Sequence, residues 1–323
     1  MKAAVTGGTG VVGTAVVRHL VAAGHEVVGL ARSPEAAAKL RELGAHPVSG
    51  DLFDTDAVDA LVEGADWVFH IAGINELCSG DPELMWRVNV EGTRRMVEAC
   101  RRAGVSRLVH TSSAVTIGEE QGTVATESTR HRGWYLSAYE RSKHAAERVA
   151  LTDAEGLEVV VVNPSSVQGP GRASGTGAVL LAAARGRLRF VVDTHLSLVD
   201  IDDCARGHLL AAERGRPGAR YLLSGATLAM DEAVALLSEV AGTQLRPWRM
   251  HPAALTVLGT VVGGVYKLTG RTAPLCREMV RVIRFGHRYD GSLATRELGL
   301  DYTPVEETLR RTLEWFRSEG LLE

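Results

Sequence analysis

The sequence predicts an α/β fold, with a parallel sheet covered by helices on both faces. Along the first half of the chain, strand-like apolar segments alternate with helical ones, which is the order of βαβ units. Residues 158–162 read E-V-V-V-V, the continuous β-branched run expected of a strand buried on both faces. A length of 323 residues with 45% hydrophobic content supports a large core, in one domain or two.

The elements can be assigned in chain order. A short apolar strand at residues 3–5 leads into a glycine-rich turn and a helix that presents Val12, Val16 and Leu20 on one side. The remaining strands are expected at residues 26–30, 67–71, 107–111 and 158–162, and helices at residues 35–43, 81–103 and 138–151. Ligands of such sheets bind at the carboxyl ends of the strands, so residues there are candidates for a site.

The glycine-rich turn carries the first chemical signal. Gly7, Gly10 and Gly13 follow a G-x-x-G-x-x-G spacing between a strand and a helix. The first glycine permits a tight turn, the second admits a pyrophosphate, and the third lets helix and strand pack closely. The phosphates then lie at the positive end of the helix. The pattern therefore predicts dinucleotide binding in a Rossmann-type, doubly wound sheet.

A second signal is the segment S-A-Y-E-R-S-K, where Tyr139 and Lys143 share one face of a helix. A phenol with a pKa of about 10 exchanges protons poorly at neutral pH unless a cation stabilises its anion. Bringing that pKa to near 7 requires about 4 kcal/mol. One unit charge about 4 Å away supplies about that much at an effective dielectric constant of about 20. Lys143 is placed to supply this charge.

The segment V-V-G-L-A-R-S-P at the second strand bears on the choice of cofactor. Folds that select NAD place an acid near the end of this strand to bind the ribose 2′-hydroxyl, whereas an arginine there accommodates a 2′-phosphate. Here Ala31 stands in place of the acid, and Arg32 and Ser33 follow. A guanidinium can form two hydrogen bonds to a phosphate. NADP(H) is therefore favoured, with NAD(H) as the alternative.

Composition argues against several other classes of protein. The net charge of −3, with both signs interspersed, provides no basic stripe for nucleic acid. The cysteines lack metal-ligand spacing, so we expect neither a metal site nor a disulfide framework, but buried thiols. They are Cys78, Cys100, Cys204 and Cys276. The first strand starts beside Met1 and leaves no room for a leader or anchor, from which we expect a cytoplasmic protein.

Residues 253–266 form an apolar stretch that is too short to span a bilayer, so no integral membrane segment is expected. A core helix is the first interpretation, and a lid over a pocket or a helix on a membrane surface are the alternatives. The second half also contains several arginines whose spacing does not define a clamp for a diphosphate. These are Arg185, Arg187, Arg189, Arg246, Arg249, Arg281 and Arg284. Together these features favour a small or apolar substrate over a nucleotide sugar.

The segments T-G-G-T-G-V-V-G, G-D-L, H-I-A-G, N-V-E-G-T, T-S-S-A and Y-E-R-S-K resemble the extended short-chain dehydrogenase/reductase superfamily over nearly the whole chain. The later segments N-P-S-S-V-Q-G-P-G and L-V-D-I-D-D-C-A-R-G-H are similar to its dihydroflavonol-4-reductase-like, 3β-hydroxysteroid-dehydrogenase-like and hopanoid-associated epimerase group. The resemblance implies a Rossmann domain from residues 1–164 with 192–212. A smaller, mostly helical substrate-binding domain would comprise residues 165–191 with 213–323. It also implies a homodimer formed by the helices at 81–103 and 138–151.

The resemblance further implies roles for individual residues. Tyr139 would be the general acid/base, Lys143 its electrostatic partner and a ligand of the nicotinamide ribose, and Ser113 would orient the reacting oxygen, with Ser112 as the alternative. Asn89 would support the site through its helix, or else would only kink that helix. The full set of implied cofactor contacts is Gly7, Thr9, Gly10, Val11, Val12, Gly13, Arg32, Asp51, Leu52, Ala72, Thr111, Tyr139, Lys143 and Pro164.

Within that set, the Asp51 carboxylate would accept from the adenine amino group and Leu52 would pack on the ring. Capping of the next helix is the competing role for Asp51, although Asp54 or Thr55 is better placed to cap it. His70 is expected to be structural. Residues 76–81 and 131–137 should border the substrate, with Trp134 and Tyr135 available to stack on a ring.

Related dehydratases carry an acid pair where this chain has Ala114 and Val115, which argues against dehydration. We therefore expect an NADP(H)-dependent oxidoreductase that interconverts a ketone or aldehyde and an alcohol. A nucleotide-sugar epimerase with tightly held NAD would use the same triad and is the alternative. A dinucleotide-binding sensor or scaffold is a second alternative. Relatives of that kind usually lack the tyrosine or the lysine of the pair, whereas this chain has both Tyr139 and Lys143. The sequence does not identify the small-molecule substrate.

Overall fold

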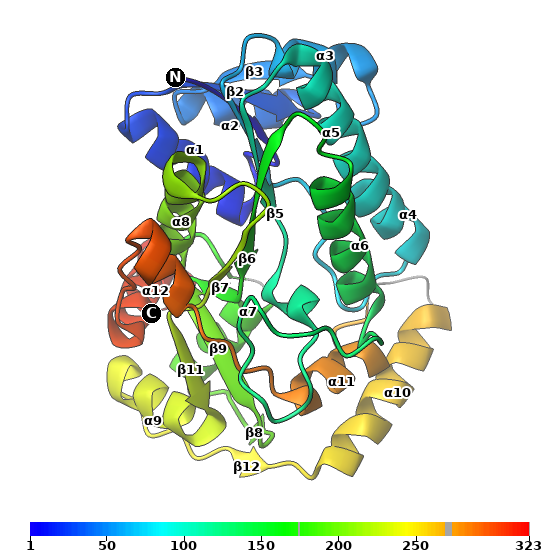
Figure 1. Ribbon diagram of the computed structural model, residues 1–323. Helices are drawn as coiled ribbons and strands as arrows, with labels where there is room; N and C mark the ends of the chain where they lie inside the picture. Colours follow the sequence, from blue (N-terminus) through cyan, green and yellow to red (C-terminus); the bar gives the residue numbers. More distant parts are fainter. Residues whose placement is uncertain (174, 269–272, 323) are drawn as a thin grey trace.

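A computed structural model describes residues 1–173, 175–268 and 273–322. Its centre is a seven-stranded sheet in the order β10-β6-β5-β4-β1-β2-β3, in which every pair of neighbours is parallel (Figure 1). The strands are β1 (Lys2–Thr6), β2 (Glu26–Ala31), β3 (His46–Ser49), β4 (Trp67–His70), β5 (Arg107–Thr111), β6 (Glu158–Pro164) and β10 (Arg220–Leu223). The predicted doubly wound parallel sheet is confirmed. Its strand order reverses between β1 and β4, which is where such sheets form their ligand crevice.

Helices cover both faces of this sheet (Figure 1). Ala3 and Val5 of β1 pack on one side and Ala4 on the other, and the four valines of β6 alternate in the same way. The E-V-V-V-V run is thus buried on both faces, as its composition predicts. One layer contains α1 (Val11–Ala22), α2 (Pro34–Glu42) and α8 (Ile201–Arg214), and the other α3 (Thr55–Val62), α5 (Gly92–Ala103) and α6 (Ala138–Thr152).

The helix expected at residues 81–103 is interrupted. It consists of α4 (Pro82–Trp86), a π-helical turn (Arg87–Glu91) and α5. Asn89 lies inside the π-helical turn and is buried. Turns of this kind widen a helix by one residue and occur often at functional sites. The apolar periodicity of the sequence continues through this segment and does not reveal the interruption.

The rest of the chain forms a smaller part below the large sheet in Figure 1. It contains a three-stranded sheet in the order β11-β9-β7 and the two-stranded pair β12-β8. The strands are β7 (Ser166–Gln168), β8 (Phe190–Val191), β9 (His195–Asp200), β11 (Ala226–Ala229) and β12 (Trp248–Arg249). The helices are α7 (Thr176–Ala184), α9 (Met230–Ala241), α10 (Pro252–Leu268), α11 (Arg277–Phe285) and α12 (Val305–Ser318). Two short helical turns pack on the large part instead, η2 (Ala114–Ile117) on α6 and η3 (Ala294–Leu298) on α8.

The sheet that each strand joins can be compared with the predicted division into domains. β10 belongs to the large sheet, although the sequence assigns residues 213–323 to the smaller domain. β9 lies in the small sheet, although residues 192–212 are assigned to the Rossmann domain. The division at these boundaries remains a prediction, and the chain passes between the two parts more often than the sequence suggests.

The apolar stretch at residues 253–266 lies within α10. Leu255 is buried, but Val257, Val261 and Val265 are 64%, 58% and 54% exposed. The expectation of an ordinary core helix is therefore wrong for one face of α10, because only the opposite face packs on α11. Among the described residues, no helix combines the length and the apolar composition needed to cross a bilayer.

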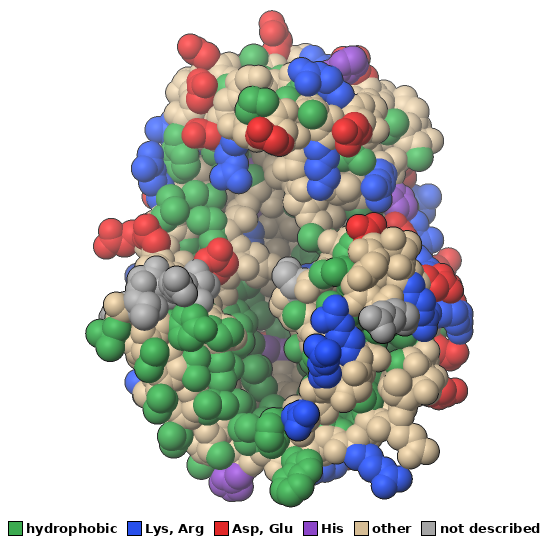
Figure 2. Space-filling view, turned by 180° about the vertical axis from the view of Figure 1, so that it is seen from behind, with side chains coloured by type: hydrophobic (Ala, Val, Ile, Leu, Met, Phe, Trp, Pro, Cys, Tyr) green, Lys and Arg blue, Asp and Glu red, His purple; other side chains and the backbone are tan. Residues whose placement is uncertain are grey.

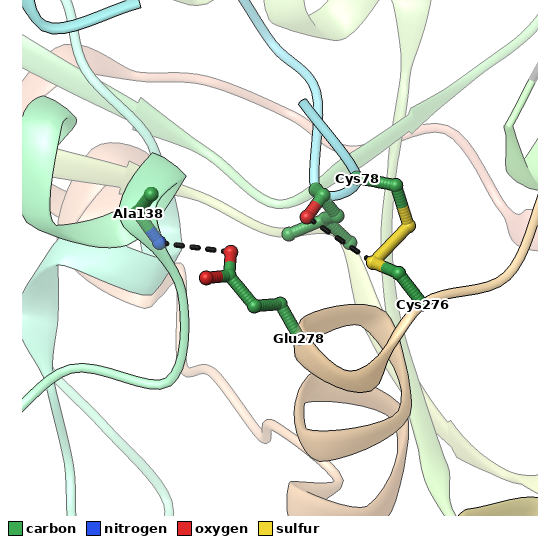
Figure 3. Close-up of a disulfide and its surroundings, with 5 residues drawn as sticks. Cys78, Ala138, Cys276 and Glu278 are labelled. Carbon is green, nitrogen blue, oxygen red and sulfur yellow. Dashed lines mark hydrogen bonds between the residues drawn. A yellow bond between two sulfur atoms is a disulfide. The ribbon is translucent and has the colours of Figure 1, made fainter. Parts of the chain in front are cut away.

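The cysteine prediction needs a correction. Cys78 and Cys276 form a disulfide, with their Cα atoms 5.7 Å apart, whereas Cys100 and Cys204 are buried free thiols as expected (Figure 3). The bonded pair is separated by 198 positions, so spacing in the sequence could not reveal the contact. The bond joins the loop after β4 to the residue before α11. Nearby, the Glu278 carboxylate accepts a hydrogen bond from the Ala138 N–H at 3.0 Å, which ties α11 to the start of α6.

Replacing Cys276 with serine should lower the free energy of unfolding by about 2–4 kcal/mol, because the disulfide restricts the unfolded chain. The measurement is guanidinium denaturation without a reductant. Wild-type protein with a reductant should match the variant, while the reductant should leave the variant unchanged. Equal unfolding midpoints for the oxidised wild type and the variant would show that the bond does not form.

Candidate functional site

The glycine-rich loop follows β1 and packs against the segment after β4. Gly7 has a φ of 71°, and a Cβ there would lie 2.7 Å from the Ala72 nitrogen. A Cβ on Gly13 would lie 2.0 Å from the Gly7 carbonyl oxygen. Both positions therefore require glycine, for the turn and for close packing respectively. Gly10 is the N-cap of α1, and no side chain caps this helix end. The loop thus offers the backbone surface and helix N-terminus that fit a pyrophosphate.

The other predicted cofactor contacts lie along the same edge of the sheet. Thr9, Val11 and Val12 belong to the loop or the start of α1, and Arg32 and Asp51 follow β2 and β3. Ala72, Thr111 and Pro164 lie after or at the ends of β4, β5 and β6. The structure therefore brings these residues to the crevice edge.

At the end of β2, Arg32 is exposed and the Ser33 hydroxyl accepts a hydrogen bond from the Ala36 N–H at 3.2 Å, capping α2. Lys39, which the sequence analysis did not identify, extends from α2 and donates to the Thr9 carbonyl at 2.9 Å. A second cation therefore lies beside the glycine-rich loop. The sequence could have indicated Lys39, because it lies in the helix that directly follows the second strand.

The two roles considered for the acid after β3, adenine contact and helix capping, fall to different residues. Asp54 caps α3 by accepting from the Ala57 N–H at 3.1 Å. The exposed Asp51 carboxylate accepts from the Phe53 N–H at 2.7 Å, and Leu52 beside it is buried. The capping role thus belongs to Asp54, and Asp51 remains available at the rim of the crevice.

Tyr139 and Lys143 lie in the first two turns of α6. The helix begins after Ser137, whose hydroxyl caps it by accepting from the Glu140 N–H at 3.1 Å. The Ser113 hydroxyl lies near the Tyr139 phenol and lowers its pKa, whereas the Ser112 hydroxyl donates to the buried Glu147 carboxylate at 2.5 Å. Neighbouring residues of an extended chain point to opposite sides. The geometry therefore favours Ser113 over Ser112 as the serine of the site.

The electrostatics of the phenol differ from the sequence expectation. Burial raises the pKa of Tyr139, and the Ser113 hydrogen bond and the Arg172 charge oppose that rise. Arg172 is the cation whose charge opposes that rise. It lies in the loop after β7, and its buried Nε atom has no hydrogen-bond partner among the described residues. The sequence analysis overlooked Arg172, although an arginine directly after the Q-G-P-G segment at a strand end was a usable signal.

Lys143 is anchored at the end of β5. Its Nζ atom donates to the Thr111 carbonyl at 2.7 Å, and its side chain is buried. Burial lowers the pKa of Lys143 to about 8, and the charge of Glu147 opposes that change. The ammonium is thus held at a fixed place beside the crevice.

Asn89 connects the segment after β4 to α6. Its Oδ1 atom accepts from the Ile74 N–H at 2.7 Å, and its Nδ2 atom donates to the Ser142 hydroxyl at 2.9 Å. A Cβ on Gly73 would lie 3.0 Å from Asn89 Oδ1 and 3.6 Å from Lys143 Nζ. Asn89 therefore marks the helix interruption and also supports the site. Because Gly73 has no side chain, Asn89 and Lys143 can lie close to its backbone.

Beneath this surface lie buried polar groups with structural roles. His70 bonds to the Thr6 hydroxyl at 2.8 Å and to the Thr93 hydroxyl at 3.1 Å, and burial followed by the Lys143 charge lowers its pKa to about 3. The neutral imidazole is structural, as expected. The Glu147 carboxylate accepts from Thr116 at 2.7 Å and from Asn163 at 2.8 Å, which ties α6 to neighbouring segments. Sequence reasoning did not identify Glu147.

The expected substrate border faces the smaller part of the molecule, and Figure 2 shows a hollow between the two parts. Trp134 is 50% exposed, and the Tyr135 hydroxyl hydrogen-bonds to the His144 ring at 2.8 Å. An open pocket at the start of α6 is lined by both residues together with Trp86 and by Arg281 of α11. The aromatic side chains named from the sequence therefore line a recess at the start of α6.

Comparison with known proteins agrees with this arrangement. Residues 3–224 match the NAD dependent epimerase/dehydratase family. The chain is 35% identical to a putative dihydroflavonol 4-reductase of Synechocystis sp., over 98% of this chain and 94% of that protein. It is 31% identical to sterol demethylase protein B of Methylococcus capsulatus over 100% of both chains. Among solved structures, a nucleoside-diphosphate-sugar epimerase from Pseudomonas aeruginosa is 28% identical with a TM-score of 0.81, covering 100% of this chain and 99% of that chain.

Replacing Lys143 with methionine should remove a rise in stability at alkaline pH. Below pH 8, the buried ammonium is charged in both the folded and unfolded states, and the folded state bears the full desolvation penalty. Above pH 8, the folded state releases the proton before the unfolded state, whose lysine has an ordinary pKa of 10.5. The free energy of unfolding of the wild type should therefore rise relative to the variant, by up to about 1.4 kcal/mol per pH unit. Denaturation of both proteins between neutral and alkaline pH measures this, and parallel curves would contradict it.

Proposed function

Because the chain belongs to the NAD dependent epimerase/dehydratase family and is an oxidoreductase of the short-chain dehydrogenase/reductase type, we propose that it interconverts a ketone or aldehyde and an alcohol with NADP(H). The observation that carries the proposal is that Tyr139 and Lys143 lie one turn apart on α6, with the Ser113 hydroxyl close enough to the buried phenol to lower its pKa. An acid, a hydrogen-bonding hydroxyl and a fixed cation are the groups that carbonyl reduction requires.

The residues of the crevice are suited to a nicotinamide dinucleotide. The glycine-rich loop would hold the pyrophosphate, Asp51 and Leu52 the adenine, and Lys143 the nicotinamide ribose. When bound, the cofactor supplies or accepts a hydride. Arg32 and Lys39 form a positively charged border near the end of β2, where Ala31 takes the place of an acid. This charge supports NADP(H) over NAD(H).

The side chains of this protein would handle the proton. Burial keeps the Tyr139 phenol protonated at neutral pH, so that it can donate its proton to the substrate oxygen as that oxygen gains negative charge. The Ser113 hydroxyl would position the same oxygen. The charges of Arg172 and Lys143 would then stabilise the phenolate that remains. In alcohol oxidation the phenolate would accept the proton.

An apolar carbonyl compound is the substrate class we propose. Aromatic side chains line the recess at the start of α6, and one similar protein is named a reductase and another is named for sterol demethylation. A homodimer and a cytoplasmic location are further parts of the proposal. Sedimentation tests the first. The second is tested by the state of Cys78 and Cys276 in rapidly quenched cells, because disulfides seldom persist in a reducing cytoplasm.

The direct experiment is a panel of ketones and aldehydes incubated with NADPH, followed at the nicotinamide absorbance. A reductase consumes NADPH and forms alcohol in equal amounts. Conversion of a nucleotide sugar to its epimer without net cofactor consumption would instead support the epimerase. Binding of NADPH with no turnover across both substrate classes would support a sensor or scaffold.

Replacing Tyr139 with phenylalanine should lower kcat by about 10² to 10⁴-fold, because the phenol is the proton donor. The affinity for NADPH, measured by fluorescence, should be nearly unchanged. Tyr302→Phe is a matched control, since it removes a hydroxyl that donates to the Leu222 carbonyl at 3.3 Å and to the Gly291 carbonyl at 3.1 Å, away from the proposed site. Full turnover by the Tyr139 variant would rule out the acid/base role.

Replacing Arg32 with alanine should weaken NADPH binding by about tenfold or more, because it removes a charge-assisted bond to the 2′-phosphate. Binding of NADH, which lacks that phosphate, should be nearly unchanged. Arg41→Ala removes another exposed cation, from the α2 helix that follows Arg32, and serves as the control. Equal losses of affinity for both cofactors would contradict the preference for NADP(H).

A further inference from the structure

One face of α10 exposes a continuous apolar stripe. The residues that form it, called the α10 face below, are Val257, Leu258, Val261, Val265 and Leu268, which are 64%, 43%, 58%, 54% and 90% exposed. Their spacing of three and four positions places them on one side of the helix. Figure 2 shows the corresponding hydrophobic area at the lower left, extending to the edge of the hollow. Large exposed patches of this kind indicate an interaction surface.

The opposite face of α10 explains why this stripe is turned outward. Leu255 is buried, and a Cβ on Gly259 would lie 2.5 Å from a methyl carbon of Val280 in α11. Small residues thus let α10 pack closely on α11, which leaves its larger side chains on the outer side. The core of this protein therefore requires only one face of α10.

The hydrogen bonding of α10 favours a lipid over a protein partner. The Thr256 hydroxyl donates to the Pro252 carbonyl at 2.9 Å, and the Thr260 hydroxyl donates to the Thr256 carbonyl at 2.8 Å. Both hydroxyls donate within the helix, and the Thr256 hydroxyl also accepts from Arg284 of α11 at 3.1 Å. The five residues of the α10 face carry no polar side-chain atoms. Protein interfaces usually form about one hydrogen bond per 100–200 Å². The α10 face offers no side-chain groups for such bonds.

Charge and aromatic residues beside α10 point to an anionic surface. Residues 244–268 contain no Asp or Glu, whereas Arg246 and Arg249 lie just before the helix. Arg249 pairs with Asp231, and Arg246 is exposed. Trp248 and Phe190, which pair in the β12-β8 sheet, are 77% and 56% exposed. Exposed aromatic rings and arginines next to an apolar helix face are typical of segments that lie in the interface of a bilayer.

From these observations we propose that the α10 face docks on the surface of an anionic lipid bilayer, with its apolar side chains inserted among the acyl chains and the neighbouring arginines against the headgroups. The helix lies on the membrane and does not span it. Because α11 lies between α10 and the start of α6, docking places the bilayer close to the hollow. The inference rests on this surface alone and does not depend on the reaction.

The test is co-sedimentation of the full chain with phosphatidylcholine vesicles, with and without phosphatidylglycerol. The wild type should bind the vesicles that contain phosphatidylglycerol and should bind those that lack it more weakly. Changing Val257, Val261 and Val265 to serine should reduce binding by about tenfold or more, because insertion depends on the buried apolar area. Changing Arg246 and Arg249 to glutamine should reduce binding to the anionic vesicles only.

The matched control changes Leu84, Val124 and Val179 to serine, which are 45%, 54% and 49% exposed on other elements. This control should bind like the wild type. Circular dichroism checks folding, and Val261→Ser alone is the second variant if the triple variant unfolds. No sedimentation of the wild type with either vesicle, or equal binding by the α10 and control variants, would overturn the proposal. A lipid-free dimer that the α10 variant dissociates would also overturn it, in favour of a second copy.

Discussion

The arrangement of the site depends on a lysine ammonium that is buried at the end of a central strand. Removing such a charge from water is unfavourable unless other groups compensate. The Thr111 carbonyl accepts a hydrogen bond from Lys143, and Glu147 supplies an opposing charge. Because Lys143 belongs to α6, the same bond fixes this helix against the end of β5. The phenol one turn earlier is thereby held beside Ser113.

Local sequence patterns were sufficient for the scaffold and for much of the site. The alternating strands and helices, the three glycines and the pair Tyr139 and Lys143 are encoded within short segments, and the structure places them as those segments suggest. The choice between Ser112 and Ser113 required the alternation of an extended chain and the position of Glu147. Contacts between segments far apart in the sequence could not be predicted from local patterns. Arg172 reaches the phenol from another loop, the Cys78–Cys276 bond links segments 198 positions apart, and the π-helical turn at Asn89 leaves no trace in the apolar pattern.

In our proposal, the large part of the molecule binds the cofactor and the smaller part contributes to substrate binding. The large sheet presents backbone and fixed charges along one edge, which suits a cofactor with a constant shape. The smaller part brings Arg172 to the phenol and is attached to the large part by the Cys78–Cys276 disulfide and by the bond between Glu278 and Ala138. Family membership thus accounts for the redox chemistry of the first part. In our proposal, substrate choice depends on the second part, which contributes Arg172.

A crystal structure of the protein with NADP⁺ tests the central claim most directly. The nicotinamide ribose should hydrogen-bond to Lys143, with the ring over the backbone at Gly73 and the reactive face open to Tyr139. The 2′-phosphate should lie beside Arg32. A dinucleotide bound elsewhere, or a nicotinamide ring turned away from Tyr139 and Lys143, would contradict the assignment of this crevice as the active site.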